Sequence, residues 1–200
     1  MLIRQFCAAF LLLPTSLLVP ELSSADPGGH AIRSQLQTAA KAVDAGEIAK
    51  ALSATKKALH MLRDKAPLQL SRLTVLQKPP QGLGMFKASP KGQVHDGKLL
   101  LYVEVRNFVS QPTQDRKWRV DLRTDASFYY ADGSFIARKD NIGQHHFVAS
   151  TRHDVTFMVV ELNLRGMPAQ PYQLELTVHD ANSGKKSKAR CDFTIVKTHK

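Results

Sequence analysis

Apolar and polar side chains alternate through residues 172–196, and this pattern constrains the fold more than any other stretch of the chain. The apolar positions on the two sides of a polar link at 180–185 are Tyr172, Leu174, Leu176, Val178, Ala189, Cys191, Phe193 and Ile195. Successive side chains of a β-strand point to opposite faces, so this spacing buries one face and leaves the other in water. The stretch therefore predicts a β-hairpin with one wet face.

Two amphipathic helices are expected before the strands begin. Ile32, Leu36, Ala39, Ala40 and Val43 share one face at helical spacing, and Gly46 can take the left-handed turn that follows a helix. The second helix, which ends before Pro67, places these residues on one face: Ile48, Ala51, Leu52, Thr55, Leu59 and Leu62. We therefore assign residues 26–67 to a helical hairpin.

The second helix resembles that of a tetratricopeptide repeat at Gly46, Ala51 and Ala58. Arg63 stands where that repeat usually has proline, and no second copy follows. Such repeats need about three stacked copies to bury their faces, so a solenoid is not expected. The leading interpretation is one hairpin packed on the domain that follows it.

Residues 68–200 predict an immunoglobulin-like antiparallel β-sandwich of about seven strands. Besides the last hairpin, strands are expected at 73–75, 99–109, 118–130, 135–139 and 155–164. The lead-in Pro171-Tyr172 suggests a tyrosine corner, a hydroxyl latch at the start of strand F in that fold. Trp118 is either the core tryptophan of strand C or a cap on the end of its strand.

Two of these strands carry specific expectations about burial. In 99–109 the apolar residues alternate, which places Tyr102, Glu104 and Arg106 on the wet face. In 155–164 both parities are apolar, which predicts a strand covered on both faces.

The chain also resembles a loose group of uncharacterised bacterial exported proteins that join a helical hairpin to an immunoglobulin-like domain. The resemblance rests on residues 101–108 (LYVEVRNF) and 172–184. It implies a fold and an exported location, and it implies no particular activity.

The first 25 residues are interpreted as a cleaved signal peptide. Arg4 precedes a largely apolar run at 6–19, and small residues end at Ala25. A membrane anchor is the weaker interpretation, because the run is shorter than the roughly 20 residues that a bilayer requires and Pro14 interrupts it. We therefore expect a periplasmic or extracellular protein with no stable membrane span after cleavage.

Cys191 is the only cysteine after the predicted cleavage site, so the exported chain can form no internal disulfide. It lies on the apolar side of its strand, where a free cysteine acts as a small hydrophobic residue.

The chain carries a formal net charge of +11, which favours anionic partners. The candidate ligand-binding residues are Lys185, Lys186, Lys188 and Arg190, at the last hairpin. An anionic envelope polymer or an acidic protein is the expected partner, and a merely solvated face is the other interpretation. Nucleic acid is not expected, because the chain has an export signal and no recognition-helix or RNA-binding motif.

A histidine group at His145, His146 and His153 is the candidate metal site of an alternative hypothesis, a periplasmic metal-binding protein. His95 or His179 could complete the three or four donors that zinc or copper needs. Adjacent histidines in a strand point to opposite faces, so surface histidines are the preferred interpretation.

No hydrolase or phosphate-loop motif occurs in the sequence. Asp121 and Asp125, beside Arg119 and Arg123, indicate a salt-bridged surface ladder rather than a pair of catalytic acids. The sequence thus favours an exported, non-enzymatic binding or envelope-structural module without a cofactor.

Overall fold

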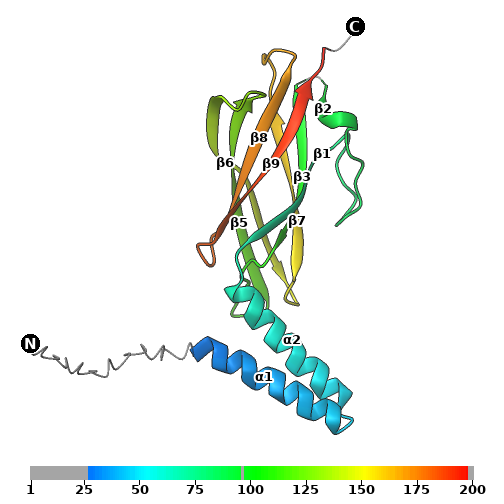
Figure 1. The fold of residues 1–200 in the computed structure, drawn as a ribbon, viewed down its shortest axis with the longest axis vertical. Coiled ribbons are helices and arrows are strands. Elements are labelled where there is room, and N and C mark those ends of the chain that lie inside the picture. Colours follow the sequence, from blue (N-terminus) through cyan, green and yellow to red (C-terminus); the bar gives the residue numbers. More distant parts are fainter. Residues whose placement is uncertain (1–26, 96, 198–200) are drawn as a thin grey trace, which may run out of the picture.

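The computed structural model describes residues 27–95 and 97–197, so the predicted signal peptide lies outside the described residues. Two helices, α1 (Pro27–Asp44) and α2 (Ile48–Lys65), come first, and the rest is mainly β-strand (Figure 1). In the described ranges, no helix combines the length and apolar character needed to cross a membrane.

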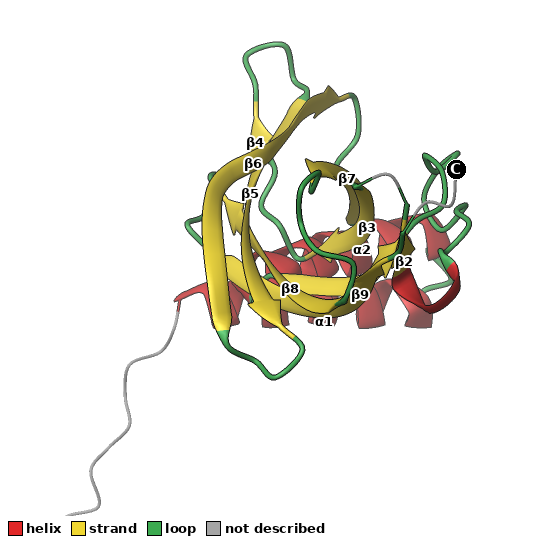
Figure 2. Cartoon of the chain, turned by 90° about the horizontal axis from the view of Figure 1, so that it is seen from above, coloured by secondary structure: helices red, strands yellow, loops and turns green. Residues whose placement is uncertain are grey.

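The strands form two sheets that curl around one shared interior (Figure 2). The smaller sheet has the order β1-β3-β7, and the larger one runs β2-β9-β8-β5-β4, with β6 also paired to β5. Every pairing is antiparallel except the short one between β2 and β9. The strand bounds are β1 (Gln69–Val75), β2 (Gln93–Val94), β3 (Lys98–Arg106), β4 (Gln111–Pro112), β5 (Trp118–Tyr130), β6 (Phe135–Ala149), β7 (Val155–Asn163), β8 (Pro171–Asp180) and β9 (Lys186–Ile195), with a short 3-10 helix η1 (Pro90–Gly92) before β2.

The predicted last hairpin is confirmed as β8 and β9, which pair in register with Leu174 opposite Cys191. The side chains of Leu174, Leu176 and Val178 are fully buried, and Phe193 joins them in the core. Cys191 packs against this core from its edge, as its strand position predicted.

Strand β6 is longer than its predicted range of 135–139. It pairs along nearly all of β5, from Phe135 opposite Tyr129 to Ala149 opposite Trp118. The register shifts twice along this pair, and Asn141 takes a positive φ of 53°. These irregularities break the period-2 pattern, which is why the sequence did not predict the second half of the strand.

The expected faces of β3 and β7 were wrong, except that Arg106 at the end of β3 is exposed as predicted. Tyr102 and Glu104 of β3 are 0% and 3% exposed. Leu76 and Phe86 from the segment after β1 cover Tyr102 together with Phe157, and the Tyr102 hydroxyl donates to Glu104 at 3.1 Å. Strand β7 is instead covered on one face, and alternate residues from 159 to 163 are exposed. β3 is therefore the doubly covered strand, since one of its faces packs in the shared interior and the other packs against Leu76, Phe86 and Phe157.

The tyrosine latch at the start of β8 is present. The hydroxyl of Tyr172 donates to the carbonyl oxygen of Pro168 at 3.0 Å and accepts from the Gln170 side chain at 3.1 Å. Trp118 is half-buried at the first residue of β5, with the Arg152 guanidinium 5.5 Å from its ring centroid. Of the two roles left open for Trp118, the structure favours the cap on the strand end.

The helical hairpin meets the strands at its end and points away from them (Figure 1). Small side chains fill the interface between the helices, chiefly Ala39, Ala51, Ala54 and Ala58. Apart from Ile32, which is buried, the leucine, isoleucine and valine side chains of the helices remain exposed. The expected packing of the hairpin on the strand domain is thus limited to the last turn of α2.

Candidate functional site

The four basic residues predicted to bind a ligand divide into two groups. Lys186, Lys188 and Arg190 alternate along β9 and are all exposed on the outer face of the larger sheet. Lys185 precedes the strand and is half-buried at the base of the helical hairpin. The structure therefore brings three of the four predicted residues together on one face.

Two of these three cations share a buried carboxylate. The side chain of Lys188 donates to Glu175 at 2.7 Å, and that of Arg190 donates to its other oxygen at 2.9 Å. The hydrogen bond from Lys188 is the main cause that lowers the pKa of Glu175, and Arg190 adds to it against the effect of burial. Because Glu175 is 7% exposed, these cations first neutralise an internal charge.

A row of basic residues crosses three strands beside this cluster. Arg123 of β5 lies directly opposite His179 of β8, which lies directly opposite Lys186 of β9. Arg123 and Lys186 are exposed, and neither makes a salt bridge or side-chain hydrogen bond within the described residues. An anion bound over His179 would lie between these two exposed cations.

Asp125 orients the histidine at the centre of the row. A ring nitrogen of His179 lies 2.9 Å from this carboxylate, which also accepts the backbone N–H of Asn141 and a hydrogen bond from Arg138. Burial would raise the pKa of Asp125, but these partners outweigh burial and lower it. The predicted ladder with Arg119 and Arg123 was wrong, because the neighbouring strands β6 and β8 supply the partners of Asp125.

The row borders an open hollow of about 350 Å³, which is lined by both bases and acids: Arg123, Asp125, Arg138, Asp140, Asn141 and His179. Within the described ranges, no serine, threonine or cysteine side chain hydrogen-bonds to His179. The hydrogen bond between His179 and Asp125 holds the imidazole in place.

We call Arg123, His179, Lys186, Lys188 and Arg190 the outer basic face. The sequence analysis missed Arg123 and His179, because both lie outside the dense run of basic residues at the last hairpin. Only the pairing of β5 with β8 brings them beside β9. A partial signal was available, since both residues occupy polar positions of strands that the alternation predicted.

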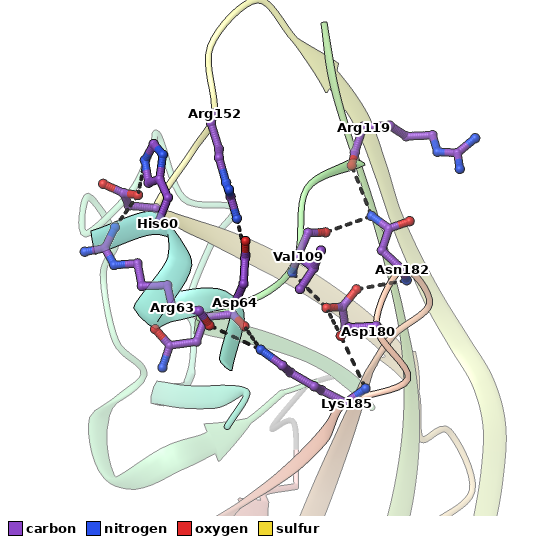
Figure 3. A network of polar contacts seen from close by, with 12 residues as sticks. His60, Arg63, Asp64, Val109, Arg119, Arg152, Asp180, Asn182 and Lys185 are labelled. Atoms are coloured by element: carbon purple, nitrogen blue, oxygen red, sulfur yellow. Dashed lines mark hydrogen bonds and ion pairs between the residues drawn. The ribbon is translucent and has the colours of Figure 1, made fainter. Parts of the chain in front are cut away.

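Lys185 belongs to a polar network that joins the hairpin to the strands (Figure 3). Its ammonium group donates to the carbonyl oxygens of Arg63 and Asn107 at 3.2 and 3.1 Å. Burial lowers the pKa of Lys185, while Asp180 and Asp64 act in the opposite direction. Lys185 is therefore a structural residue rather than a member of the outer basic face.

Ion pairs hold the same joint from the other side. Arg63 of α2 pairs with Asp154, and Asp64 pairs with Arg152 from the loop between β6 and β7, while a ring nitrogen of His60 lies 3.4 Å from Asp154 (Figure 3). Arg152 and Asp154 of that loop thus bind the last turn of α2, and the helical hairpin is attached to the strands at several points.

The three histidines of the alternative metal site do not converge. His145 faces inward and lies 3.0 Å from the hydroxyl of Thr156, whereas His146 lies on the other face near Asp121. His153 instead packs edge-on against Phe147. In the part of the chain that the structure describes, no three potential ligand side chains are grouped to hold a metal.

Comparisons with known proteins identify no family. No family model matches the chain, and no curated protein matches it. Among solved structures, the Pseudomonas fluorescens alkylpurine DNA glycosylase AlkC aligns at a TM-score of 0.37 and 14% identity, over 85% of this chain and 38% of that one. A Bacteroides uniformis β-glucuronidase aligns at 0.30 and 14% identity, over 64% of this chain and 13% of the other. The chain thus spans well under half of either protein, and likenesses this low leave the function to be argued from the site.

Proposed function

We propose that this protein is an exported, non-enzymatic binding module that contacts an anionic envelope polymer through the outer basic face. The observation that carries the proposal is the pair of exposed cations Arg123 and Lys186, which flank His179 on three neighbouring strands and make no salt bridge within the described residues. Lys188 and Arg190 continue the positive surface along β9, with Glu175 beneath them. An extended polyanion matches this geometry because it can follow several cations at once.

The proposal includes an immunoglobulin-like fold for residues 68–200. Supporting it, the order β9-β8-β5-β6 parallels strands G-F-C-C′ of variable-type domains, and β1-β3-β7 parallels A-B-E. The latch at Tyr172 lies at the start of the strand that corresponds to F. Domains of this fold serve many binding functions, so the fold is compatible with the proposal and does not select a ligand.

The proposed location is the periplasm or the cell exterior, where anionic polysaccharides and lipid headgroups are the abundant polyanions. It rests on the predicted signal peptide at residues 1–25 and on the resemblance to exported proteins. In this location nucleic acid is not an expected partner, although the protein is basic.

The test uses cations that have no internal role. Arg123→Gln with Lys186→Gln removes two exposed charges without leaving a buried acid unpaired, unlike substitution of Lys188 or Arg190. The probe is a heparin column, followed by lipopolysaccharide-coated resin. We expect elution at clearly lower salt, and a slope of log affinity against log salt that falls by roughly 1.5, as for two lost contacts to a linear polyanion.

The matched control is Lys56→Gln with Lys57→Gln on α2, which removes the same charge from exposed positions. It should change elution only slightly, because these lysines lie outside the outer basic face. An equal shift for both double variants, or no retention of the wild-type protein, would overturn the proposal.

A further inference from the structure

Six aliphatic side chains of the helical hairpin are exposed, which is unusual for leucine, isoleucine and valine in such number. We call them the hairpin face: Leu36, Val43, Ile48, Leu52, Leu59 and Leu62. Their exposed fractions run from 39% at Leu59 to 66% at Leu52. The sequence analysis expected these positions to be buried by the strand domain.

The hairpin face is continuous across both helices. Ile48, Leu52, Leu59 and Leu62 fall on one side of α2 at helical spacing, and Leu36 and Val43 fall on one side of α1. The alanines between the helices allow close packing and leave these larger residues on the same side of the antiparallel pair. Two adjacent ridges with a shallow groove between them result.

The rest of the described chain does not cover this face. The hairpin is held end-on at the last turn of α2 by Asp154, Arg152 and Lys185, and it extends away from both sheets (Figure 1). Several contacts to different loops fix that direction. The face is therefore held open in a defined orientation.

The charge of the hairpin limits what can cover the face. The two helices contain seven lysine and arginine residues against the acids Asp44 and Asp64. Of the bases, Arg33 borders the face on α1 and Lys56 borders it on α2, and both are exposed without a salt bridge in the described residues. A second copy would oppose like charges across the contact, so the occupant should be acidic.

The side chains of the face favour a helix over a lipid surface. Helices α1 and α2 contain no phenylalanine, tyrosine or tryptophan, which are common on helices that lie in a membrane interface. Lys41, Lys50 and Lys57 lie on the opposite side by helical spacing, where they would not reach lipid headgroups. Leucine ridges with a groove between them are instead the usual receptor for a third helix.

We propose that the hairpin face docks an acidic amphipathic helix of a partner protein. The helix lies in the groove between α1 and α2 with its leucines on the hairpin face. Its glutamate or aspartate residues, on the flanks of its apolar stripe, pair with Arg33 and Lys56. This site is separate from the outer basic face, so either proposal can fail without the other.

The experiment measures the binding of labelled synthetic helices to the full exported chain by fluorescence anisotropy. One peptide carries leucines at helical spacing with glutamates on both flanks, and its partner has lysines at those flanks. We expect the glutamate peptide to bind at least about tenfold more tightly. Leu52→Gln with Leu59→Gln should abolish binding, whereas Lys50→Gln with Lys57→Gln, on the opposite side of α2, should leave most of it.

A charge reversal sharpens the test. Arg33→Glu with Lys56→Glu should weaken the glutamate peptide and strengthen the lysine peptide, a swap that a merely unfolded variant cannot produce. Arg123→Gln with Lys186→Gln should leave peptide binding unchanged, which separates this site from the outer basic face.

Three results would overturn the proposal. The first is that neither peptide binds, or that both bind equally well to the wild-type protein. The second is a dimer in sedimentation that Leu52→Gln with Leu59→Gln dissociates, which would assign the face to a second copy. The third is co-sedimentation with vesicles of anionic lipid that the same variant abolishes, which would assign it to a membrane.

Discussion

The ammonium group of Lys185 lies 3.2 Å from the carbonyl oxygen of Arg63, a residue 122 positions earlier in the chain. The same group also reaches the carbonyl oxygen of Asn107 at 3.1 Å. One side chain before β9 thereby ties the end of α2 to the loop after β3. These carbonyls would otherwise lack a charged donor at a partly buried joint.

Replacing Lys185 with methionine should loosen this joint. The variant keeps the length of the side chain and removes the donor, so we expect a loss of about 1–2 kcal/mol in the free energy of unfolding. Urea melts measure this loss, and faster cleavage near residues 66–68 in limited proteolysis would locate it. Lys186→Met is the control, since Lys186 is exposed and should shift stability by less than about 0.5 kcal/mol. Equal stability of the two variants would show that Lys185 does not hold the joint.

Tyr172→Phe should cost about 1 kcal/mol or somewhat more, because the Pro168 carbonyl loses its hydrogen bond while the ring still packs on Phe193. Urea melts again provide the measurement. Tyr130→Phe is the matched control, since the Tyr130 ring stacks on Tyr172 and its residue is 43% exposed. An unchanged midpoint for Tyr172→Phe would count against the latch, and with it against the immunoglobulin-like assignment.

Cys191 should resist alkylation in the native protein. Burial raises the pKa of its thiol to about 12, so almost no thiolate is present at neutral pH. Iodoacetamide at about pH 8 should modify this residue only after unfolding in urea, as read by mass spectrometry. Rapid labelling of the folded chain would mean that the strand edge at Cys191 opens readily.

The stability of the protein should decline as the pH falls from about 7.5 to about 5.5, in part because of His145. Burial lowers the pKa of His145 in the folded state, while the unfolded chain takes up a proton near the ordinary value of about 6.5. Stability from this group is thus present above that pH and is lost as acid favours the unfolded state. Burial, and then the charge of Arg152, act on the pKa of His60 in the same direction.

His145→Gln should flatten this dependence, because glutamine can still reach Thr156 and does not titrate. Thermal melts at the two pH values measure the slope, and His146→Gln provides the control from the exposed face of the same strand. If His145→Gln retains the full wild-type slope, other groups account for the acid sensitivity.

Local patterns in the sequence predicted the helices and strands whose apolar residues recur at regular spacing. The hairpin of β8 and β9 followed from period-2 alternation, and the two helices followed from apolar spacing around Gly46. The second half of β6 was missed because bulges against β5 interrupt the pattern. The burial of Tyr102 was missed because Leu76 and Phe86 cover it from a segment that carries no strand signal of its own.

The residues of the candidate site also divide into those that the sequence predicted and those that only the structure brought together. Lys186, Lys188 and Arg190 were predicted as one surface because a single strand sets their parity. Arg123 and His179 could be assigned to the outer basic face only from the pairing of β5 with β8. Lys185 is not part of the outer basic face, because its ammonium group binds a carbonyl oxygen at the end of α2.

By itself, the sequence determined the two helices, the position of most of the longer strands and which side of the last hairpin is buried. These properties follow from repeats of two or 3.6 residues, which neighbouring residues alone define. Only the tertiary structure decided where the hairpin face points, which cations are neutralised by Glu175 and Asp125, and which strands meet to form the outer basic face. These outcomes depend on contacts between residues far apart in the chain, because burial and charge pairing belong to the partners that folding brings together.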